Sequence, residues 1–457
     1  MSDLYGVFFE KVLYPGWESG LRRRPTLSYL DRLKRSEWCS IDELKAIQGA
    51  ELRGLVDHAY RHSPYYRRAF EERGLLPNDI RTIDDLGKLP LLTRKQASDS
   101  FQDRLSAAEP LPRIRKMTSG TTGHPLAFAY DVGSEYWRQA TKLRGYGWAG
   151  YRPGDRSLHF WGSMAAVHGS PLMKKVKVAL DRRMRREHFI DCSDHSKEAL
   201  SKVVRHLRAF RPKVIVCYAQ AGAALARHIV ETRSRDWESL TVISAAERLF
   251  PGDRDAMKEA FGTNIFETYG SREVMLIAAE CEAHQGLHVS MENLAVEIIV
   301  REGDAVRPAR AGELGEVVVT DLHNYGAPFI RYVNGDLAVA APAQRCACGR
   351  ELGRIQQIEG RQTDTLHDGQ GRPVGGMFFI VVFSALADKV RSFQVVQRKD
   401  RSIDLNLVKG ALFDDAVLSL VKHSCEKAIP GIDVRLHVVP DIPVGPGGKS
   451  RVVVVEN

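Results

Sequence analysis

Apolar residues recur at three- and four-residue spacing through the first quarter of the chain. The clearest run follows Ser40 and places Leu44, Leu52 and Leu55 on one side of the segment. This spacing is typical of an amphipathic helix, and Ser40 with Glu43 fits a capping box at its start. The pattern therefore predicts a helical segment over about residues 1–110.

From residue 111 onward, short β-like runs alternate with helical patterns. Val214–Tyr218 followed by Ala221–Thr232 is an example. This alternation is typical of a β-sheet covered by helices. The helical patterns stop over about residues 287–345, where runs such as Ala295–Val300 and Gly315–Thr320 predict a hairpin-rich β subdomain.

After residue 360 the pattern changes again. Two β-like runs, Ser392–Gln397 and Ser402–Val408, precede a helical pattern at Asp414–Ala428. A segment of roughly 90 residues with these elements has the size of a small α+β domain. The sequence therefore predicts an α/β protein with a large domain at residues 1–363 and a small mobile domain at residues 364–457.

Composition narrows the class of protein. The chain of 457 residues is 44% hydrophobic and 27% charged, as is ordinary for a soluble globular protein. No run approaches the ~20 apolar residues that span a bilayer, and no basic region precedes an apolar core at the N-terminus. Seven cysteines without an export signal fit a reducing compartment. We therefore expect a cytoplasmic protein with no membrane partner.

Basic residues are clustered, and the net charge is +9. The runs are Arg22–Arg24, Lys174–Lys175 and Arg182–Arg186. Because no nucleic-acid-binding motif accompanies them, we expect no nucleic-acid partner. Charge patterning favours a solvated face, with attraction of nucleotide or coenzyme phosphates as the alternative.

A run of small hydroxyl and glycine residues lies between two β-like runs, Arg113–Lys116 and Leu126–Tyr130. Glycine lets backbone amides approach phosphate oxygens, and hydroxyl groups add donors. No Gly-Lys-Ser/Thr closes the run, so it is not a Walker A loop. The run predicts a phosphate-binding loop, with a polar hairpin turn as the alternative. Its candidate residues are Thr118, Ser119, Gly120, Thr121, Thr122 and Gly123.

Three cysteines and one histidine form a second constellation: Cys281, His288, Cys346 and Cys348. Three thiolates and one imidazole suit a closed tetrahedral zinc site, which would be structural because no open position remains. The alternative is three reduced cysteines and a surface histidine.

The phosphate loop resembles that of the adenylate-forming superfamily, and four further motifs match that superfamily in the right order. They are Glu267–Glu273 (adenine and magnesium), Arg331–Asp336 (ribose), Gly360–Asp364 (hinge) and Gly445–Lys449 (lysine loop). Within the superfamily the chain is similar to the phenylacetate–CoA ligase-like group, which includes CapK-like proteins. Pro64-Tyr65-Tyr66 and Leu89–Arg94 resemble that group's N-terminal segment, and similar Cys and His positions recur in it.

The resemblance implies roles for residues of these motifs. Lys449 would bridge the substrate carboxylate and the α-phosphate, Glu273 would hold Mg²⁺, and Thr118 is a further catalytic candidate. Asp364 would be the hinge of the mobile domain. The remaining residues implied in ATP or AMP binding are Ala246, Glu247, Thr268, Tyr269, Gly270, Ser271, Asp336 and Arg361.

The acyl pocket is expected around Trp161, His168 and Tyr218, a lining that favours an aromatic or short acyl group. The implied function is ATP-dependent activation of a small carboxylate to an acyl-adenylate, followed by transfer to coenzyme A.

Two alternatives stay open. Residues 371–378 depart from the segment that builds the thioester-forming face in this group, so an amine is the alternative acceptor. A nucleotide-binding protein without turnover is the second alternative. The sequence leaves the acid, the pathway and the oligomeric state open, a homodimer included.

Overall fold

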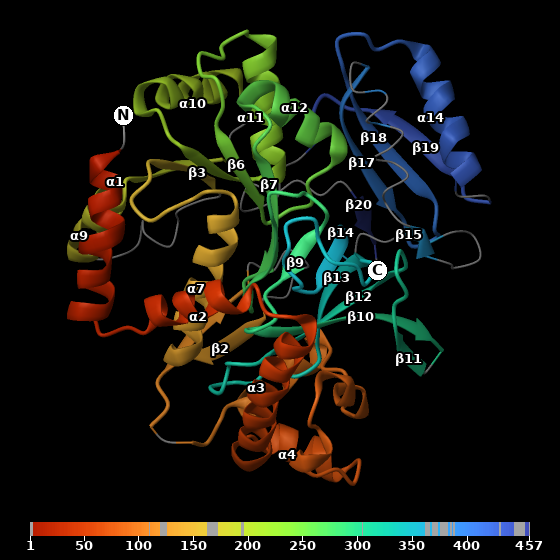
Figure 1. Cartoon of the computed structure of the whole chain (residues 1–457). Coiled ribbons are helices and arrows are strands. Elements are labelled where there is room, and N and C mark those ends of the chain that lie inside the picture. The colour runs from red at the N-terminus through yellow and green to blue at the C-terminus, as the bar shows by residue number, and fades with distance from the viewer. Residues whose placement is uncertain are drawn as a thin grey trace.

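The computed structural model describes residues 3–108, 110–118, 126–161, 172–192, 196–303, 305–361, 366–367, 373–374, 383, 386, 389–428, 431–442 and 453–456. Figure 1 shows helices on both sides of a long sheet, with the N-terminal helices at one end and the C-terminal elements beside the sheet. The α/β class predicted from the sequence is confirmed.

Helices dominate the N-terminal segment, as predicted. In α3, Ser40 Oγ accepts the Glu43 N–H at 3.4 Å and Glu43 accepts the Ser40 N–H at 2.8 Å, which completes the expected capping box. The elements are α1 (Leu4–Phe8), η1 (Phe9–Leu13), η2 (Gly16–Leu21), α2 (Thr26–Ser36), α3 (Ile41–His62), α4 (Pro64–Glu71), η3 (Pro77–Asp79), η4 (Ile83–Lys88), α5 (Arg94–Asp99) and α6 (Phe101–Arg104).

A twelve-stranded sheet forms the body of the described structure, in the order β11-β10-β12-β13-β14-β9-β8-β7-β6-β5-β3-β4. Strands β3 to β7 are parallel and the others antiparallel. Their bounds are β3 (Ser157–Trp161), β4 (Glu187–Asp191), β5 (Val214–Tyr218), β6 (Thr241–Ala245), β7 (Ile265–Ser271), β8 (Met275–Glu280), β9 (Leu287–Val289), β10 (Leu294–Glu302), β11 (Ala305–Pro308), β12 (Leu314–Asp321), β13 (Tyr332–Ala340) and β14 (Arg354–Arg361).

Helices connect the parallel strands, because such strands need crossover connections. They are α9 (Leu172–Arg185), α10 (Lys197–Phe210), α11 (Ala219–Glu231) and α12 (Pro251–Phe261), while α7 (Val132–Trp148) links β2 to β3. Strands β1 (Arg113–Met117) and β2 (Ala127–Asp131) form an antiparallel pair that flanks the predicted phosphate loop. The two central parallel strands, β5 and β6, are mostly apolar and almost fully buried, as expected for strands covered on both faces.

The hairpin-rich region belongs to the large sheet. Its strands do not form a sheet of their own, because β8 pairs with β7 and thereby continues the parallel sheet into β9 to β14. The sequence pattern gives the strands of this region but not the sheet to which they belong, since strand pairing is set by long-range contacts.

The C-terminal elements form a separate four-stranded sheet, β19-β18-β17-β20, among the described residues. Helix α14 (Asp415–Ala428) contacts this sheet, and Val421 and Leu405 are fully buried in a core of its own. The boundary at residue 364 stays a prediction. The remaining strands are β15 (Leu366–His367), β16 (Pro373–Val374), β17 (Val390–Gln397), β18 (Ile403–Lys409), β19 (Val434–Val438) and β20 (Val453–Val455).

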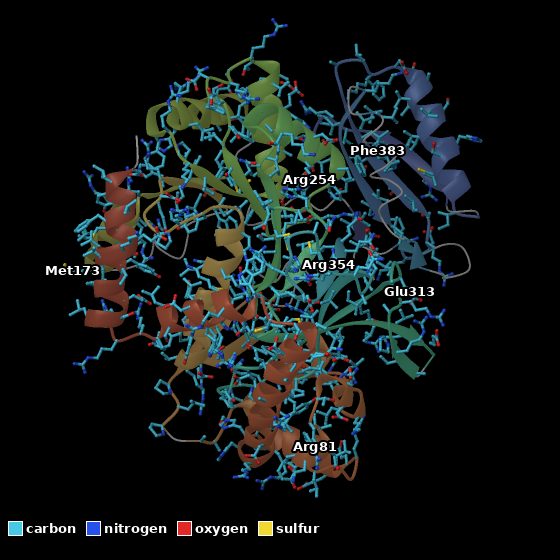
Figure 2. All side chains as sticks on the ribbon, viewed as in Figure 1. Arg81, Met173, Arg254, Glu313, Arg354 and Phe383 are labelled. Atoms are coloured by element: carbon cyan, nitrogen blue, oxygen red, sulfur yellow. The ribbon has the colours of Figure 1, made fainter. Side chains whose placement is uncertain are left out.

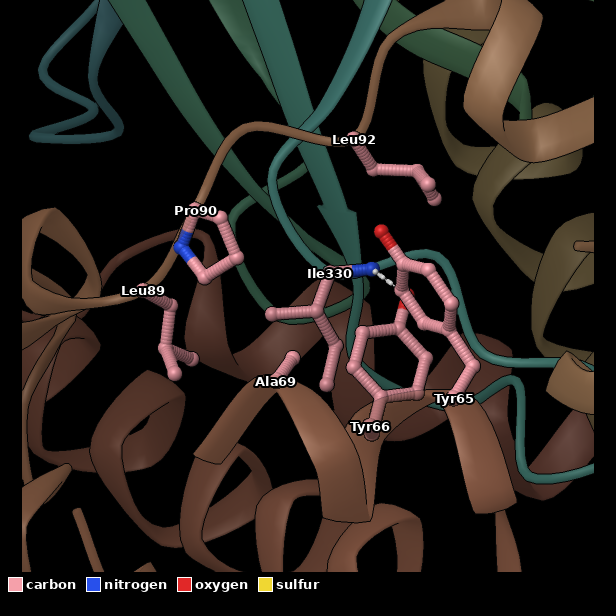
Figure 3. Close-up of a pocket in the computed structure, with 7 residues that line it drawn as sticks. All are labelled: Tyr65, Tyr66, Ala69, Leu89, Pro90, Leu92 and Ile330. Atoms are coloured by element: carbon pink, nitrogen blue, oxygen red, sulfur yellow. Dashed lines mark hydrogen bonds between the residues drawn. The ribbon is translucent and has the colours of Figure 1, made fainter. Parts of the chain in front are cut away.

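A small cavity marks the junction between the N-terminal helices and the sheet (Figure 3). Tyr66 Oη accepts the Ile330 N–H at 2.9 Å and donates to the Pro328 carbonyl at 2.9 Å. The cavity measures about 10 Å³, which is room for a single water and excludes an organic substrate. Next to it, Leu92 pairs with the backbone at Tyr332, so the following residues, Thr93 and Arg94, start α5 beside β13.

Candidate active site and metal centre

Two aromatic side chains meet at the carboxyl ends of neighbouring parallel strands. Trp161 ends β3 and Tyr218 ends β5, with ring centroids 4.4 Å apart. Strand β3 lies between β4 and β5, so successive strands of the chain are added on opposite sides of β3 and the strand order reverses at this point. Open α/β sheets bind ligands at such a switch point. The structure thus brings together two of the three residues expected in the acyl pocket.

The loop after β6 lies beside the same edge. Ala246 has a left-handed backbone with φ +67°, which turns the chain sharply after the strand. Glu247 then accepts the backbone N–H of Gln220 at 3.1 Å, in the first turn of α11. A carboxylate near a helix N-terminus is favoured by the helix dipole. This contact fixes the segment that the resemblance places against adenine.

Tyr269, Asn334 and Asp336 form a buried hydrogen-bonded triangle. The Tyr269 hydroxyl donates to Asp336 Oδ2 at 2.7 Å, and Asn334 Nδ2 donates to Tyr269 Oη at 2.7 Å and to Asp336 Oδ2 at 2.9 Å. Tyr269 belongs to β7 and the other two to β13. The structure therefore joins the adenine motif and the ribose motif through side chains, a contact that the sequence alone does not reveal.

A second group of side chains gathers around Tyr332, near the start of β13. Tyr332 precedes Asn334 by two residues on β13. The Tyr332 hydroxyl is 3.3 Å from Glu273 Oε1, and Arg94 Nη1 is 3.2 Å from the same oxygen. Burial and the nearby Glu273 carboxylate raise the pKa of Tyr332, so its hydroxyl stays a donor.

Arg94 links this group to the base of the phosphate loop. Its Nη2 donates to Thr118 Oγ1 at 2.9 Å, and Thr118 Oγ1 also accepts the Leu126 N–H at 2.9 Å. Thr118 and Glu273, two of the predicted catalytic residues, thus share one guanidinium. The sequence analysis missed Arg94 as a site residue. Its signal is its position directly after Leu89–Thr93, which resembles the group's N-terminal segment.

Backbone register adds one more residue to the site. Arg361 ends β14 and lies directly opposite Asp336 across the β13–β14 pair. The start of the hinge motif therefore pairs with the ribose motif through the backbone.

The surroundings of three residues of β7 explain why glycine, threonine and serine occupy these positions. A Cβ at Gly270 would lie 2.1 Å from the Met275 carbonyl oxygen, so only glycine allows the close turn into β8. Thr268 Oγ1 donates to the Ser244 carbonyl at 2.9 Å. Ser271 Oγ is buried without a hydrogen-bond partner among the described residues, and a buried polar atom of this kind fits a ligand-binding position.

We expect Asp336→Ala to raise the KM for ATP about 10- to 100-fold, because a charged acceptor of one or two ligand hydrogen bonds is lost. Tyr269→Phe keeps the ring and removes only the bond to Asp336, so its KM should rise about fivefold. Tyr269→Ala also removes the ring and should resemble Asp336→Ala. Steady-state kinetics of the three variants checks this, and an unchanged KM in Asp336→Ala would contradict the assignment.

Glu267, the first residue of the adenine motif, carries a buried carboxyl group. Burial first, and then the Glu280 carboxylate, raise its pKa from the ordinary 4.5 to about 7. The folded state therefore binds a proton more tightly than the unfolded state. The stability that this contributes is present below pH 4.5 and is lost as the pH rises through about 7.

We therefore expect the free energy of unfolding of wild type to fall by about 2 kcal/mol between pH 5 and pH 7, relative to that of Glu267→Gln. Glutamine can still accept the Leu249 N–H but does not titrate. Urea unfolding at several pH values measures the difference. Parallel stability curves for the two proteins would show that Glu267 titrates normally.

The four predicted zinc ligands form one cluster, with all donor atoms within 4.8 Å of one another. The Cys281 and Cys346 sulfurs are 3.7 Å apart, and Cys348 Sγ is 3.4 Å from His288 Nε2. Tetrahedral Zn²⁺ with bonds of about 2.3 Å to sulfur and 2.05 Å to nitrogen gives separations of about 3.8 Å and 3.6 Å. A disulfide would instead bring the sulfurs to about 2.05 Å. The spacing fits a metal centre.

Neighbouring groups orient the His288 ring and shift the pKa values of His288 and Cys348. The His288 Nδ1 lies 3.2 Å from the Leu352 carbonyl, which fixes the ring and leaves Nε2 facing the sulfurs. Burial lowers the pKa of His288 to about 4, so its imidazole is neutral. Burial would raise the pKa of Cys348, but hydrogen bonds from the Arg350 backbone and side chain outweigh it and lower the pKa. The residues present therefore suit a metal ion.

Several predicted residues lie outside the described part of the structure. They are Ser119, Gly120, Thr121, Thr122, Gly123, His168, Asp364 and Lys449. The backbone of Arg361 is described as the end of β14. In the described part of the chain, the helices are too short or too polar to cross a bilayer.

Known proteins are similar to this chain in sequence and in structure. No protein-family model matches it. The phenylacetate-coenzyme A ligase of Thermus thermophilus is 26% identical over 413 residues, which cover 87% of this chain and 88% of that protein.

Two crystal structures of 2-hydroxyisobutyryl-CoA ligase share the fold, and each match covers 93% of this chain and 92% of that chain. The postadenylation state in complex with R3-HIB-AMP has a TM-score of 0.72 at 18% identity. The thioesterification state in complex with 2-HIB-AMP and CoA has a TM-score of 0.57 at 19% identity. The chain is therefore a relative of the phenylacetate-coenzyme A ligases and has the fold of the adenylate-forming ligases.

Proposed function

We propose that this protein uses ATP to convert a small carboxylate into an acyl-adenylate and then transfers the acyl group to coenzyme A. The curated relative is named a phenylacetate-coenzyme A ligase, and a structural neighbour was crystallised with an acyl-AMP and CoA. The observation that carries the proposal is that one strand, β13, contacts two groups of site residues. Asp336 and Tyr269 suit a nucleoside, and Glu273, Arg94 and Thr118 lie at the base of the predicted phosphate loop.

The reaction brings two anions together, the carboxylate and the triphosphate, which repel each other. Cationic groups at the site reduce this repulsion. A carboxylate oxygen attacks the α-phosphorus of ATP, and the bond to pyrophosphate breaks. Arg94 supplies a fixed cation, and Glu273 would hold Mg²⁺, which supplies charge neutralisation when bound. Lys449 would stabilise the charge that develops on the α-phosphate. Asp336 orients the ribose and so positions the phosphorus for attack.

The second half-reaction requires a different set of contacts at the same acyl-adenylate. A thiol sulfur attacks the acyl carbonyl and AMP leaves. We propose that residues 364–457 rotate about Asp364 between the two steps, as domain closure at a hinge allows. The two states of the structural neighbour match this chain with TM-scores of 0.72 and 0.57, which supports a change of arrangement between steps.

The substrate is proposed to be an aromatic or short-chain carboxylic acid. The tilted pair of Trp161 and Tyr218 at the switch point offers flat apolar surface to such a group. The cluster of Cys281, His288, Cys346 and Cys348 is proposed to hold a structural Zn²⁺, since four protein ligands leave no position for a substrate.

The experiment is product analysis by mass spectrometry with a panel of carboxylates. With ATP, Mg²⁺ and coenzyme A, the preferred acid should give its CoA thioester; without coenzyme A, its acyl-adenylate. If thioester never forms but an added amine yields an amide, the acceptor is an amine. Absence of both products and of AMP would leave only nucleotide binding.

A further inference from the structure

One flank of the molecule exposes apolar side chains to solvent, and none of these side chains has a role in the proposed catalysis. It consists of α1 with the two π-helical turns that follow it, residues 4–21, and of α9, residues 172–185; we call it the α1–α9 face. Figure 1 shows α1 and α9 side by side there. Tyr5 Oη donates to the Met184 carbonyl at 2.7 Å, and Arg186 pairs with Asp3 at 2.6 Å.

Helix α9 is amphipathic, but its apolar side faces solvent and its polar side faces the protein. Its exposed apolar residues recur at three- and four-residue spacing and so form one stripe. The stripe comprises Met173, Val176, Leu180 and Met184, with Met173 80% and Leu180 57% exposed. Figure 2 shows Met173 on the outer flank. Surface helices normally turn such a stripe toward the core.

The inward side of α9 is occupied by polar residues. Arg182 lies over the Phe189 ring at 4.0 Å, and Arg185 lies over the Tyr14 ring at 5.2 Å while bonding to Asp181. These contacts fix the rotation of the helix, so the apolar stripe faces outward as part of the fold. Neighbouring α1 adds Leu4, Val7 and Phe8, all exposed. A contiguous apolar surface of this kind marks an interaction site.

The charge on this flank selects the class of partner. Residues 4–21 and 172–185 together hold seven Lys or Arg and three Asp or Glu, so the α1–α9 face carries net +4 of the chain's +9. Lys177 and Arg183 are exposed and flank the apolar stripe on its two sides at 100° per residue. A second copy of the chain would bring like charges together in a symmetric interface. Nucleic acid would leave the apolar stripe against phosphates.

We propose that the α1–α9 face binds the surface of an anionic lipid bilayer. An interfacial helix combines an apolar stripe that enters the acyl boundary with Lys and Arg that meet acidic headgroups. Both parts are present here in that arrangement. The sequence alone predicts no membrane partner, because the outward direction of the stripe is visible only in the fold. Binding is peripheral and independent of the proposed adenylation.

Vesicle flotation with the full chain tests this. Vesicles of phosphatidylcholine alone are compared with equimolar phosphatidylcholine and phosphatidylglycerol, at about 0.1 M and about 1 M NaCl. The protein should float with the anionic vesicles at low salt, and far less at high salt or with phosphatidylcholine. Met173→Glu with Leu180→Glu should abolish flotation. Lys177→Ala with Arg183→Ala should weaken partitioning about 25-fold, since each basic residue contributes about fivefold.

Matched variants on the C-terminal domain serve as controls. Leu412→Glu with Leu420→Glu replaces two leucines that are 64% and 51% exposed, and Lys399→Ala with Lys422→Ala removes two exposed charges. Both should float like wild type. All four variants should keep the wild-type unfolding temperature and whatever adenylation activity wild type has, so a failure of the proposed catalysis leaves this test intact. Absence of flotation, equal flotation with both vesicles, or flotation unaffected by the α9 variants would overturn the proposal.

Discussion

Lys449→Ala is expected to lower the kcat of acyl-adenylate formation by about 10²- to 10³-fold, because a charge that stabilises the transition state is removed. Lys449 lies outside the described residues, so this prediction rests on the resemblance of its glycine-rich loop. The KM for ATP should stay nearly unchanged, in contrast to Asp336→Ala, which acts on nucleotide binding.

The two variants therefore separate the roles of the two domains. Single-turnover formation of acyl-AMP, followed with saturating ATP, measures the chemical step directly. Lys422→Ala, an exposed lysine on α14, is the matched control and should behave as wild type. Wild-type turnover in Lys449→Ala would remove the lysine from the mechanism.

Loss of the metal centre is the second large effect that we expect. Cys346→Ser with Cys348→Ser removes two of the four ligands, so protein purified without added zinc should fall from about one equivalent of metal to none. The free energy of unfolding should fall by several kcal/mol, because metal binding to a structural site is folding free energy. Cys281 and His288 would then remain buried without their partner.

Metal analysis and urea unfolding check both parts of this prediction. Cys39→Ser is the control, since Cys39 is a half-buried thiol that lies outside the cluster. Wild-type protein that contains no metal, or a double variant as stable as wild type, would show that the four residues are an ordinary buried cluster.

The local sequence pattern predicts several helices and strands correctly, because caps and apolar runs act over a few residues. The capping box at Ser40 and the apolar strand β5 are local patterns, and the structure contains them where they are expected. The relationship to phenylacetate-coenzyme A ligases is confirmed. The grouping of Cys281 and His288 with Cys346 and Cys348 is also present in the fold, although the metal itself stays a proposal.

The contacts between motifs could not be predicted, because they depend on which strands face each other. The ribose motif predicts that Asp336 accepts ribose hydroxyls, and the structure adds that it accepts the Tyr269 hydroxyl. Arg94 reaches Glu273 across 179 positions of the chain, since α5 starts beside β13. The same holds for α9, whose charges predict a solvated face but whose rotation is set by the contacts of Arg182 and Arg185.

The central claim is that this protein adenylates a carboxylate, and ATP–pyrophosphate exchange with a panel of aromatic and short-chain acids tests it most directly. Labelled pyrophosphate should enter ATP only when an acceptable acid and Mg²⁺ are both present, and coenzyme A should not be required. The exchange should be lost in Lys449→Ala and should need more ATP in Asp336→Ala. Exchange that is absent with every acid, or that proceeds equally without any acid, would contradict the account.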